Sequence, residues 1–535
     1  MDRREFVKTG MFTMAALALP APRLRGDTRA AGGMAQPDPM CSFTSDDPGL
    51  TKTYQAAIDV LHTNCLKLHR YAEPVLVEGS VYPGVWLECA PQEGAIFSAL
   101  NPEIARNNHL IFFALQKEDG QLPCSVKLDA VGFGQIQMVV PIAATAWELA
   151  ERFGDDELLQ KAYTACSSWD AWLRRYRNTR NTGLCEGFCT YDTGHDNSPR
   201  WKGIPNRCPD DDARKPPSLP GMPRICPDLS ATMYGGRLAL ASMAKALGKQ
   251  NEADQWASDA VAIRKLIVER LYSDQDASFY DLDTDNNFIR IRGDVISRVL
   301  GEHVVDTPMF ETIWQRQIHN PRAFWGPYPL PSIAMDDPAF VRPIPRNSWG
   351  GATQALTALR APRWMEHYGK PADLGWMMQR WIEAIGRHTE FRQQMDPLTG
   401  DFTRIDPGGY SPTALVYFDF HWRLSGVRQQ DDLIEWNVRP PAATGNSKFV
   451  AKVQGMTAEL TYAGPVALLH LNGKVIAQVS GVVRILTKPD GTLHSATGIS
   501  LEESHVTVSG RDRKKLTFTI SPNKSMALHP FPRHS

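Results

Sequence analysis

Residues 192–201, with the sequence DTGHDNSPRW, form the stretch of the chain best suited to acid–base chemistry. Two carboxylates, Asp192 and Asp196, stand there beside a glycine, a histidine, an arginine and a tryptophan. A carboxyl group that is partly buried against an apolar wall keeps its proton near neutral pH and can act as a general acid. Arg200 can hydrogen-bond sugar hydroxyls or hold a carboxylate in its ionised form. The pattern indicates cleavage of a glycosidic bond, and an Asp–Arg pair that only fastens the loop is the alternative.

The same stretch resembles the Gly-Trp-Asp-x-Ser-x-Arg-Trp motif of the trehalase, family 63 α-glucosidase and mannosylglycerate hydrolase group. Further segments are similar to motifs of this group in the same order, and together they span about residues 82–427. They are residues 116–123, 180–184, 227–231, 347–351 with Tyr368-Gly369 behind them, and 396–400. The resemblance implies an (α/α)6 barrel that hydrolyses α-glycosides with inversion. Inversion needs a carboxylic acid and a carboxylate about 6.5–9.5 Å apart, with a water molecule between them.

By this resemblance Asp196 is the general acid, and Arg200, Trp201 and Trp349 line the sugar subsite. The chain departs from the group at several positions, because Gly350 and Ala352 replace an arginine and a proline, and His195 replaces an aromatic residue.

The most important departure is Gln393, which stands where the group has its catalytic glutamate. A glutamine side chain cannot take a proton from water. Three hypotheses follow: another carboxylate supplies the base, the site hydrolyses an unusual glycoside with a different geometry, or the protein binds sugar without turnover.

Glu390, about one helical turn before Gln393, is our prediction for the replacement base, with simple solvation of its carboxylate as the alternative. Other carboxylates flank the same turn or the preceding joint, namely Asp396, Asp401, Asp406, Asp336 and Asp337.

The remaining predicted substrate-binding residues each have a structural alternative. Glu88 can instead form an ion pair, Asp228 can cap a helix, and His195 can simply fill an aromatic slot. The predicted substrate contacts beyond the motif tryptophans are Trp86, Glu88, Asp192, His195, Asp228, Gln393 and Gln394.

Elements that position these residues are predicted from hydrophobic periodicity. Apolar residues recur with a helical period in residues 54–68, 104–115, 139–153, 157–176, 229–247, 252–271, 349–368, 374–385 and 411–424. Long polar joints such as 190–227 and 323–348 separate them, so we expect a mainly α fold, an (α/α)6 toroid over residues 41–430, with function in the joints. After Trp436 the pattern alternates, and the Asn472-Gly473 turn predicts a hairpin. Residues 437–535 are therefore predicted to form an accessory β-sandwich.

The charge balance and the leader sequence limit the classes of partner and the cellular location that we expect for the protein. The chain of 535 residues has 58 Lys and Arg against 59 Asp and Glu, which gives no bias toward nucleic acid. Arg3 and Arg4, followed by Glu-Phe-Val-Lys and a short apolar run, resemble a twin-arginine export signal over residues 1–31. We expect an exported protein, periplasmic or extracellular, without a membrane span, whose substrate is an oligosaccharide or a small glycoside.

The nine cysteines cannot all pair within one chain, and the sequence leaves disulfides, free thiols and a zinc site open. No dinucleotide, P-loop, metalloprotease or calcium-loop motif occurs, so we expect no cofactor and no metal. A polysaccharide lyase built on Tyr191, His195 and Arg200 is a further alternative.

Overall fold

The computed structural model describes residues 40–344, 347–404, 406–440, 446–510 and 515–528, so the predicted leader over residues 1–31 lies outside the described residues. Helices dominate up to Ser425. Those whose predicted counterparts are confirmed are α1 (Pro48–Thr63), α3 (Pro102–Ala114), α4 (Ile142–Phe153), α5 (Asp156–Tyr176), α6 (Pro227–Ala246), α7 (Gln250–Leu271), α10 (Ala355–Met365), α11 (Pro371–His388) and α12 (Ser411–Ser425).

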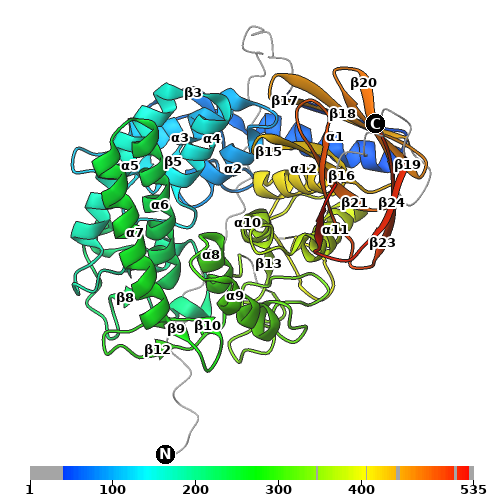
Figure 1. The fold of residues 1–535 in the computed structure, drawn as a ribbon. Coiled ribbons are helices and arrows are strands. Elements are labelled where there is room, and N and C mark those ends of the chain that lie inside the picture. Colours follow the sequence, from blue (N-terminus) through cyan, green and yellow to red (C-terminus); the bar gives the residue numbers. More distant parts are fainter. Residues whose placement is uncertain (1–39, 345–346, 405, 441–445, 511–514, 529–535) are drawn as a thin grey trace, which may run out of the picture. The chain divides into compact units, whose positions relative to one another are not determined.

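Alternate helices form a closed inner ring. Each of α2 (Ala90–Phe97), α4, α6, α8 (Val295–Gly301), α10 and α12 contacts the next, and α12 returns to α2. Helices α3, α5 and α7 pair with α2, α4 and α6 from outside, and α1 and α11 pack on α12 (Figure 1). In α12 every residue from Ser411 to Trp422 is buried, as expected for a helix enclosed on all sides. The predicted helical toroid is thus present.

Short helices escaped the sequence analysis because seven or eight residues are too few to show a 3.6-residue period. They are α2, α8 and α9 (Thr307–Ile313), the last continued by a π-helical turn over Trp314–Ile318. The helix predicted over 349–368 begins only at Ala355, because β13 (Thr353–Gln354) precedes it and pairs with β14 (Gln394–Met395). This pairing brings the turn with Gln393 beside the segment that follows Asn347.

Small sheets fill the joints between helices. One contains β4 (Gly84–Trp86), β5 (Ser125–Lys127) and β6 (Val131–Gly132). Another has the order β12 (Phe288–Ile289), β11 (Asp281–Leu282), β8 (Arg224–Ile225) and β7 (Glu186–Gly187). The second sheet holds the ends of the long joint that carries Asp196.

The C-terminal region consists of two antiparallel sheets, and β15 of the smaller one contacts β17 and β18 of the larger one. Asn472 and Gly473 have φ angles of 47° and 75°, which confirms the predicted two-residue turn. Packing of the two sheets as a complete sandwich stays a prediction. The larger sheet has the order β1 (Cys41–Ser45), β17 (Ser447–Val453), β18 (Met456–Ala463), β19 (Val466–Leu471), β20 (Lys474–Ser480), β23 (Ser504–Gly510) and β24 (Lys515–Ile520), and the smaller one β15 (Val427–Gln430), β16 (Leu433–Val438), β21 (Val483–Thr487), β22 (Leu493–Thr497) and β25 (Ser525–Ala527).

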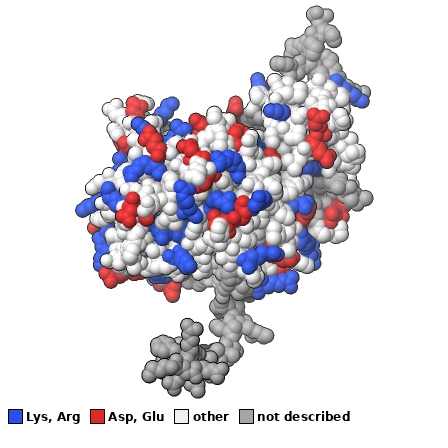
Figure 2. All heavy atoms as spheres, turned by 90° about the horizontal axis from the view of Figure 1, so that it is seen from below, with Lys and Arg blue, Asp and Glu red and all other residues white. Residues whose placement is uncertain are grey.

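The described surface carries mixed charge. On the face seen in Figure 2, basic and acidic side chains are interspersed instead of separated by sign. Among the described residues no helix is both long and apolar enough to cross a bilayer.

The N-terminal strand β1 ties the two regions together. Phe43 lies opposite Phe449 in the register, and its ring centroid is 4.7 Å from that of Phe449 and 4.4 Å from that of His421 on α12.

We expect Phe43→Ala to lower the free energy of unfolding by about 2 kcal/mol, because the half-buried ring loses its apolar and aromatic contacts. The exposed neighbour provides the control, since Thr44→Ala should change stability by less than about 0.5 kcal/mol. Chemical denaturation followed by circular dichroism measures both values. Equal stability of the two variants would show that β1 does not fasten the C-terminal sheet.

Candidate active site

The loop with Asp196 starts from a fully buried anchor, Asp192. Its Oδ1 accepts hydrogen bonds from the backbone N–H of Ile136 at 2.9 Å and from Arg177 Nη2 at 3.1 Å. Its Oδ2 accepts from Arg177 Nη1 and, at 2.7 Å, from the backbone N–H of Phe188. Protein donors therefore occupy both oxygens and hold the loop in place, and contact of Asp192 with substrate stays a prediction.

Arg200 fastens the other end of the loop to two separate elements. Its guanidinium binds Asp228 at the start of α6 through two contacts of 2.7 Å, and Asp281 on β11 through two contacts of 2.6 Å. The paired guanidinium is the main partner that holds the pKa of the buried Asp228 down, at about 2. Asp228 also accepts from the backbone N–H of Leu229 at 3.0 Å and lies in the first turn of α6. The N-cap residue of this helix is Cys226, so the alternative that Asp228 caps the helix is wrong. Arg200 and Asp228 thus neutralise each other's charge and share two hydrogen bonds.

His195 completes this buried cluster. Its Nδ1 lies 3.1 Å from Arg200 Nη1, and its Nε2 lies 2.6 Å from Asp294 Oδ1. Burial and the positive charge of Arg298 lower the pKa of His195 to about 4, against the opposing effect of Asp294. The imidazole is therefore neutral near pH 7, and it packs with its ring centroid 5.1 Å from that of Trp349. The backbone N–H of Trp349 also donates to the carbonyl of Asp196 at 3.4 Å, so both rings adjoin the backbone of Asp196.

Asp196 itself is only partly buried, next to this closed cluster. Its Oδ2 accepts a hydrogen bond of 3.0 Å from the amide of Asn347. Burial and, to a smaller extent, the negative charge of Glu88 raise the pKa of Asp196 to about 7, against the opposing effect of the hydrogen bond from Asn347. A carboxyl group with this pKa holds a proton over part of the neutral range, which is what a general acid requires.

A relay of amides links Asp196 with Gln393. The Nε2 of Gln393 donates to Asn347 Oδ1 at 2.8 Å, and Tyr82 donates its hydroxyl to Gln393 Oε1 at 3.2 Å. Trp86 packs edge-on against Tyr82, with ring centroids 5.8 Å apart. The structure therefore brings the predicted residues Trp86, Gln393 and Asp196 into one connected group.

Glu88 lies against Gly194 of the loop that carries Asp196. Its Oε1 accepts from Gln137 Nε2 at 3.3 Å, while its Oε2 has no hydrogen-bond partner among the described residues. Burial raises the pKa of Glu88, and the guanidinium groups of Arg360 and Arg298 oppose this shift. A Cβ atom added at Gly194 would lie 1.3 Å from Glu88 Oε2, so only a glycine permits this approach.

The predicted residues Glu390, Gln394 and Trp201 have partners outside the relay that links Asp196 with Gln393. Glu390 accepts from Arg392 Nε at 3.1 Å and lies 3.2 Å from Arg404 Nη2. The carbonyl of the buried Gln394 accepts from the backbone N–H of Ser348 and from Gln354, so it supports the segment beside Asn347. Trp201 is buried and donates its indole N–H to Thr193 at 2.9 Å.

The other proposed bases also have cationic neighbours. Asp336 and Asp337 pair with Arg292, Asp396 pairs with Arg342, and Asp406 lies 3.6 Å from Arg392. Asp401 lies 3.8 Å from Arg387.

Sequence reasoning missed Asn347 and Tyr82 as members of the site, although both stood in segments that it had singled out. It also missed the buried partners Asp281, Asp294 and Arg298. Arg298 donates to the carbonyl of Thr193 at 2.5 Å and lies 3.4 Å from Asp228. These residues come from short elements without a recognisable pattern, so the sequence offered no means of finding them.

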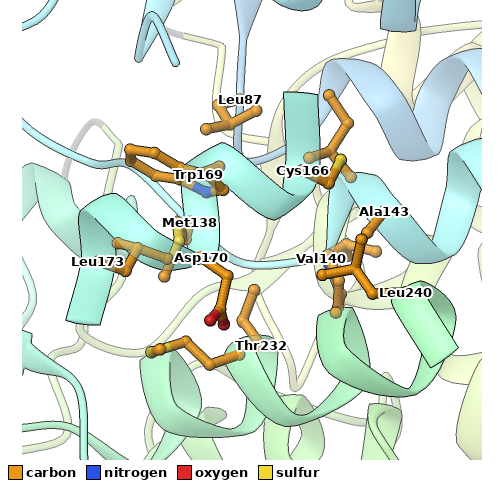
Figure 3. A pocket seen from close by; sticks show the side chains of 14 residues that line it. Leu87, Met138, Val140, Ala143, Cys166, Trp169, Asp170, Leu173, Thr232 and Leu240 are labelled. Carbon is orange, nitrogen blue, oxygen red and sulfur yellow. The ribbon is translucent and has the colours of Figure 1, made fainter. Parts of the chain in front are cut away.

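A small apolar cavity of about 40 Å3 lies between α4, α5 and α6, and Figure 3 shows Trp169, Leu173 and Leu240 among its lining side chains. The carboxylate of Asp170, another lining residue, pairs with Arg237 at 2.9 Å and with Arg174 at 2.5 Å. Ligand pockets usually measure about 300–1,000 Å3, so this cavity is a packing defect and not a sugar site. An open depression of about 570 Å3 adjoins the acid-bearing loop instead, lined by Asn197, Trp201 and Lys202 among others.

In the part of the chain that the structure describes, two groups of buried residues have the spacing of metal ligands, namely Cys189, Asp192 and Cys208, and Cys226, Asp228 and Asp281. In each group an arginine already binds the carboxylates, Arg177 in the first and Arg200 in the second. A guanidinium at this place competes with a cation for the same oxygens, so neither group favours a metal.

The closed ring of paired helices, with a partly buried aspartate on one of its joints, is the architecture of the helical-toroid class of glycoside hydrolases. The family profile described as "Mannosylglycerate hydrolase MGH1-like glycoside hydrolase domain" matches residues 92–417, more than half of the chain. The chain therefore belongs to this family, and the resemblance to the (α/α)6 glycoside hydrolase group is confirmed. No curated protein sequence matches the chain.

Solved structures show the same fold at low sequence identity. The family GH63 mannosylglycerate hydrolase of Thermus thermophilus is 18% identical and has a TM-score of 0.55, with 69% of this chain and 99% of that chain covered. The GH78 rhamnosidase of Bacillus sp. GL1 is 13% identical with a TM-score of 0.56, over 79% of this chain and 40% of that chain. Neutral trehalase of Saccharomyces cerevisiae is 13% identical with a TM-score of 0.50, over 69% and 80%.

Gly194→Ala should reduce activity at least about tenfold, since the new methyl group displaces Glu88 and moves a backbone that carries the acid two residues later. The φ angle of +61° at this position adds a conformational cost of about 1–2 kcal/mol.

Gly203→Ala is the matched control on the same loop, because φ there is +80° but no atom lies within 4 Å of the added Cβ. It should show the conformational cost alone and keep its activity. Equal activity of both variants would mean that the contact of Gly194 with Glu88 does not position Asp196.

Proposed function

We propose that the protein is an exported glycosidase that cleaves an α-linked glycoside with inversion, and that Asp196 is its proton donor. Membership of a glycoside hydrolase family supports a carbohydrate substrate, a small glycoside or an oligosaccharide. The α-linkage and the inversion rest on the resemblance to the trehalase and mannosylglycerate hydrolase group. Export rests on the twin-arginine pattern of residues 1–31, and the accessory β-sandwich over residues 437–535 belongs to the same proposal.

The observation that carries the proposal is the partly buried carboxyl of Asp196, with its pKa raised to about 7. Protonation of the glycosidic oxygen by such a group lets the leaving sugar depart as an alcohol, without a full negative charge. The buried cluster of Arg200, Asp228 and Asp281 supports this role, because it fixes the loop on which the acid stands.

The amide relay determines which oxygen of Asp196 bears the proton. The Nδ2 of Asn347 donates to Oδ2, so the acidic proton resides on Oδ1. Gln393 fixes this orientation because its Nε2 donates to Asn347 Oδ1. A carboxylate at position 393 offers no such donor, and Asn347 would then turn its own N–H group toward it. We therefore assign Gln393 and Asn347 to positioning the acid, with Tyr82 as the next donor in the relay.

Glu390 stays our proposal for the carboxylate that activates water. Its two arginine neighbours, Arg392 and Arg404, stabilise the negative charge that a base requires. We propose that Trp86, Glu88, His195 and Trp349 shape the sugar subsite, together with Arg200, Trp201, Asp192, Asp228 and Gln394.

Gln393 at the usual base position favours a second candidate function, binding of a carbohydrate without turnover. Saturable binding of oligosaccharides without release of reducing sugar would identify it.

Asp196→Asn should lower kcat for glycosides with alkyl or sugar leaving groups about 10²–10⁴-fold, since the amide donates no proton. Aryl glycosides with acidic leaving groups should lose much less, because their departure needs little protonation. Release of reducing sugar and of nitrophenol measures the two series, and NMR of the fresh product reports its anomer.

Asp210→Asn is the control for this series, because Asp210 is an exposed acid of the same joint that pairs with Lys215. Full activity of Asp196→Asn on alkyl glycosides would exclude Asp196 as the proton donor. Absence of turnover in the wild-type protein, with binding retained, would favour the second candidate.

The alkaline limb of the pH–rate profile should move in opposite directions in two variants. Activity of the wild type falls as the pH rises through about 7, where Asp196 loses its proton. Glu88→Gln removes a negative charge, so the pKa of Asp196 and the alkaline limb should move to lower pH. Asn347→Ala removes a donor to the carboxylate, so both should move to higher pH. Profiles of kcat/KM between pH 5 and 9 test this, and shifts of the same sign would show that another group controls the limb.

A further inference from the structure

Two buried thiols lie close together at the two ends of the loop that carries Asp196. The Sγ atoms of Cys189 and Cys208 lie 3.6 Å apart, and the two side chains are 0% and 3% exposed. The residues stand nineteen positions apart, and the segment between them contains Asp192, His195, Asp196 and Arg200. A bond between these sulfur atoms would therefore enclose the whole candidate acid motif in one covalent loop.

The backbone already brings the two cysteines together. The N–H of Thr190 donates to the carbonyl of Pro205 at 3.0 Å, and the N–H of Tyr191 donates to that of Asn206 at 3.1 Å. Cys208 is held from the other side, by a bond of 3.4 Å from its N–H to the carbonyl of Gly134. A disulfide has an S–S distance of about 2.0 Å, so closure needs a movement of only about 1.5 Å shared by two side chains.

The surroundings favour a sulfur–sulfur bond over a metal. Asp192 is the third possible ligand of this cluster, but Arg177 and backbone N–H groups occupy its two oxygens. Arg177 also lies 3.6 Å from the Sγ of Cys208 and stacks 4.0 Å from the ring of Phe188. A divalent cation would have to displace this buried guanidinium, whereas a neutral disulfide fits beside it.

We propose that Cys189 and Cys208 form a disulfide that locks the loop of the general acid. The oxidant is a disulfide compound such as oxidised glutathione or a disulfide-bearing oxidoreductase. One cysteine attacks the oxidant as a thiolate and releases one thiol, and the second cysteine then displaces the other. The two cysteine thiols lose two electrons and two protons in total, and the oxidant leaves as two thiols.

The bond acts mainly on the unfolded chain, whose freedom it restricts. In the folded protein it joins the beginning of the loop at Cys189 to its end at Cys208. The two ends are then held by a covalent bond in addition to the hydrogen bonds of Thr190 and Tyr191. The inference goes beyond the proposed function, because the bond can form whether or not Asp196 transfers a proton.

The test uses the purified full chain after equilibration with oxidised glutathione. Free thiols are alkylated, and the digest is examined by mass spectrometry with and without reductant. We expect a peptide pair that links Cys189 to Cys208 and disappears on reduction. The oxidised protein should melt at least about 3 °C above the same protein in dithiothreitol.

Cys189→Ser and Cys208→Ser should each abolish this difference between oxidised and reduced samples. Because each variant is compared with itself, any destabilisation by serine cancels. Cys65→Ser, on strand β2 (Cys65–Leu68), is the control and should keep the full difference.

Recovery of both thiols in alkylated form from the oxidised, folded protein would overturn the proposal. So would pairing of either residue with another cysteine, or stoichiometric zinc found by elemental analysis of the protein as purified. All these readouts are independent of glycosidase activity, so the proposed function can fail separately.

Discussion

The guanidinium of Arg200 lies in the protein interior between the carboxylates of Asp228 and Asp281, and the site depends on this interaction. Burial of three charges is costly, and loss of one partner typically costs about 3–5 kcal/mol because it leaves an uncompensated charge. The arrangement is stable because every charge finds an opposite one at hydrogen-bond distance. It joins the loop to α6 and to β11 at once, so the acid on this loop has a fixed position relative to the inner ring.

The acidic residues in and beside this cluster differ in their pKa values. Asp228 is fully paired with arginine, and its pKa is lowered to about 2. Asp196, four residues before Arg200, has only an amide donor among its described hydrogen bonds, and burial raises its pKa to about 7. The loop thus places a carboxyl group with a raised pKa four residues before an arginine that pairs with a carboxylate of lowered pKa. The difference arises because guanidinium groups face one carboxylate and a neutral amide faces the other.

Gln393 gives the chain its own character within its family. Its amide joins a relay through Asn347 to Asp196, and we therefore propose that the residue at the usual base position positions the candidate acid here. A site of this kind needs its water-activating carboxylate elsewhere, and Glu390 on the same turn is the one that we propose. The fold alone cannot decide this, because toroids of the same architecture support several chemistries.

The amino-acid sequence by itself determined the long helices, the hairpin at Asn472-Gly473 and the identity of the candidate acid, because periodicity, turn chemistry and a local motif are all written in neighbouring residues. Only the tertiary structure decided that Arg200 binds Asp281, that Glu88 lies against Gly194 and that Cys189 faces Cys208. It also placed β1 in a sheet whose other strands come after residue 446. These contacts join residues far apart in the chain, and their strength depends on burial and distance, which exist only once the ring of helices has closed.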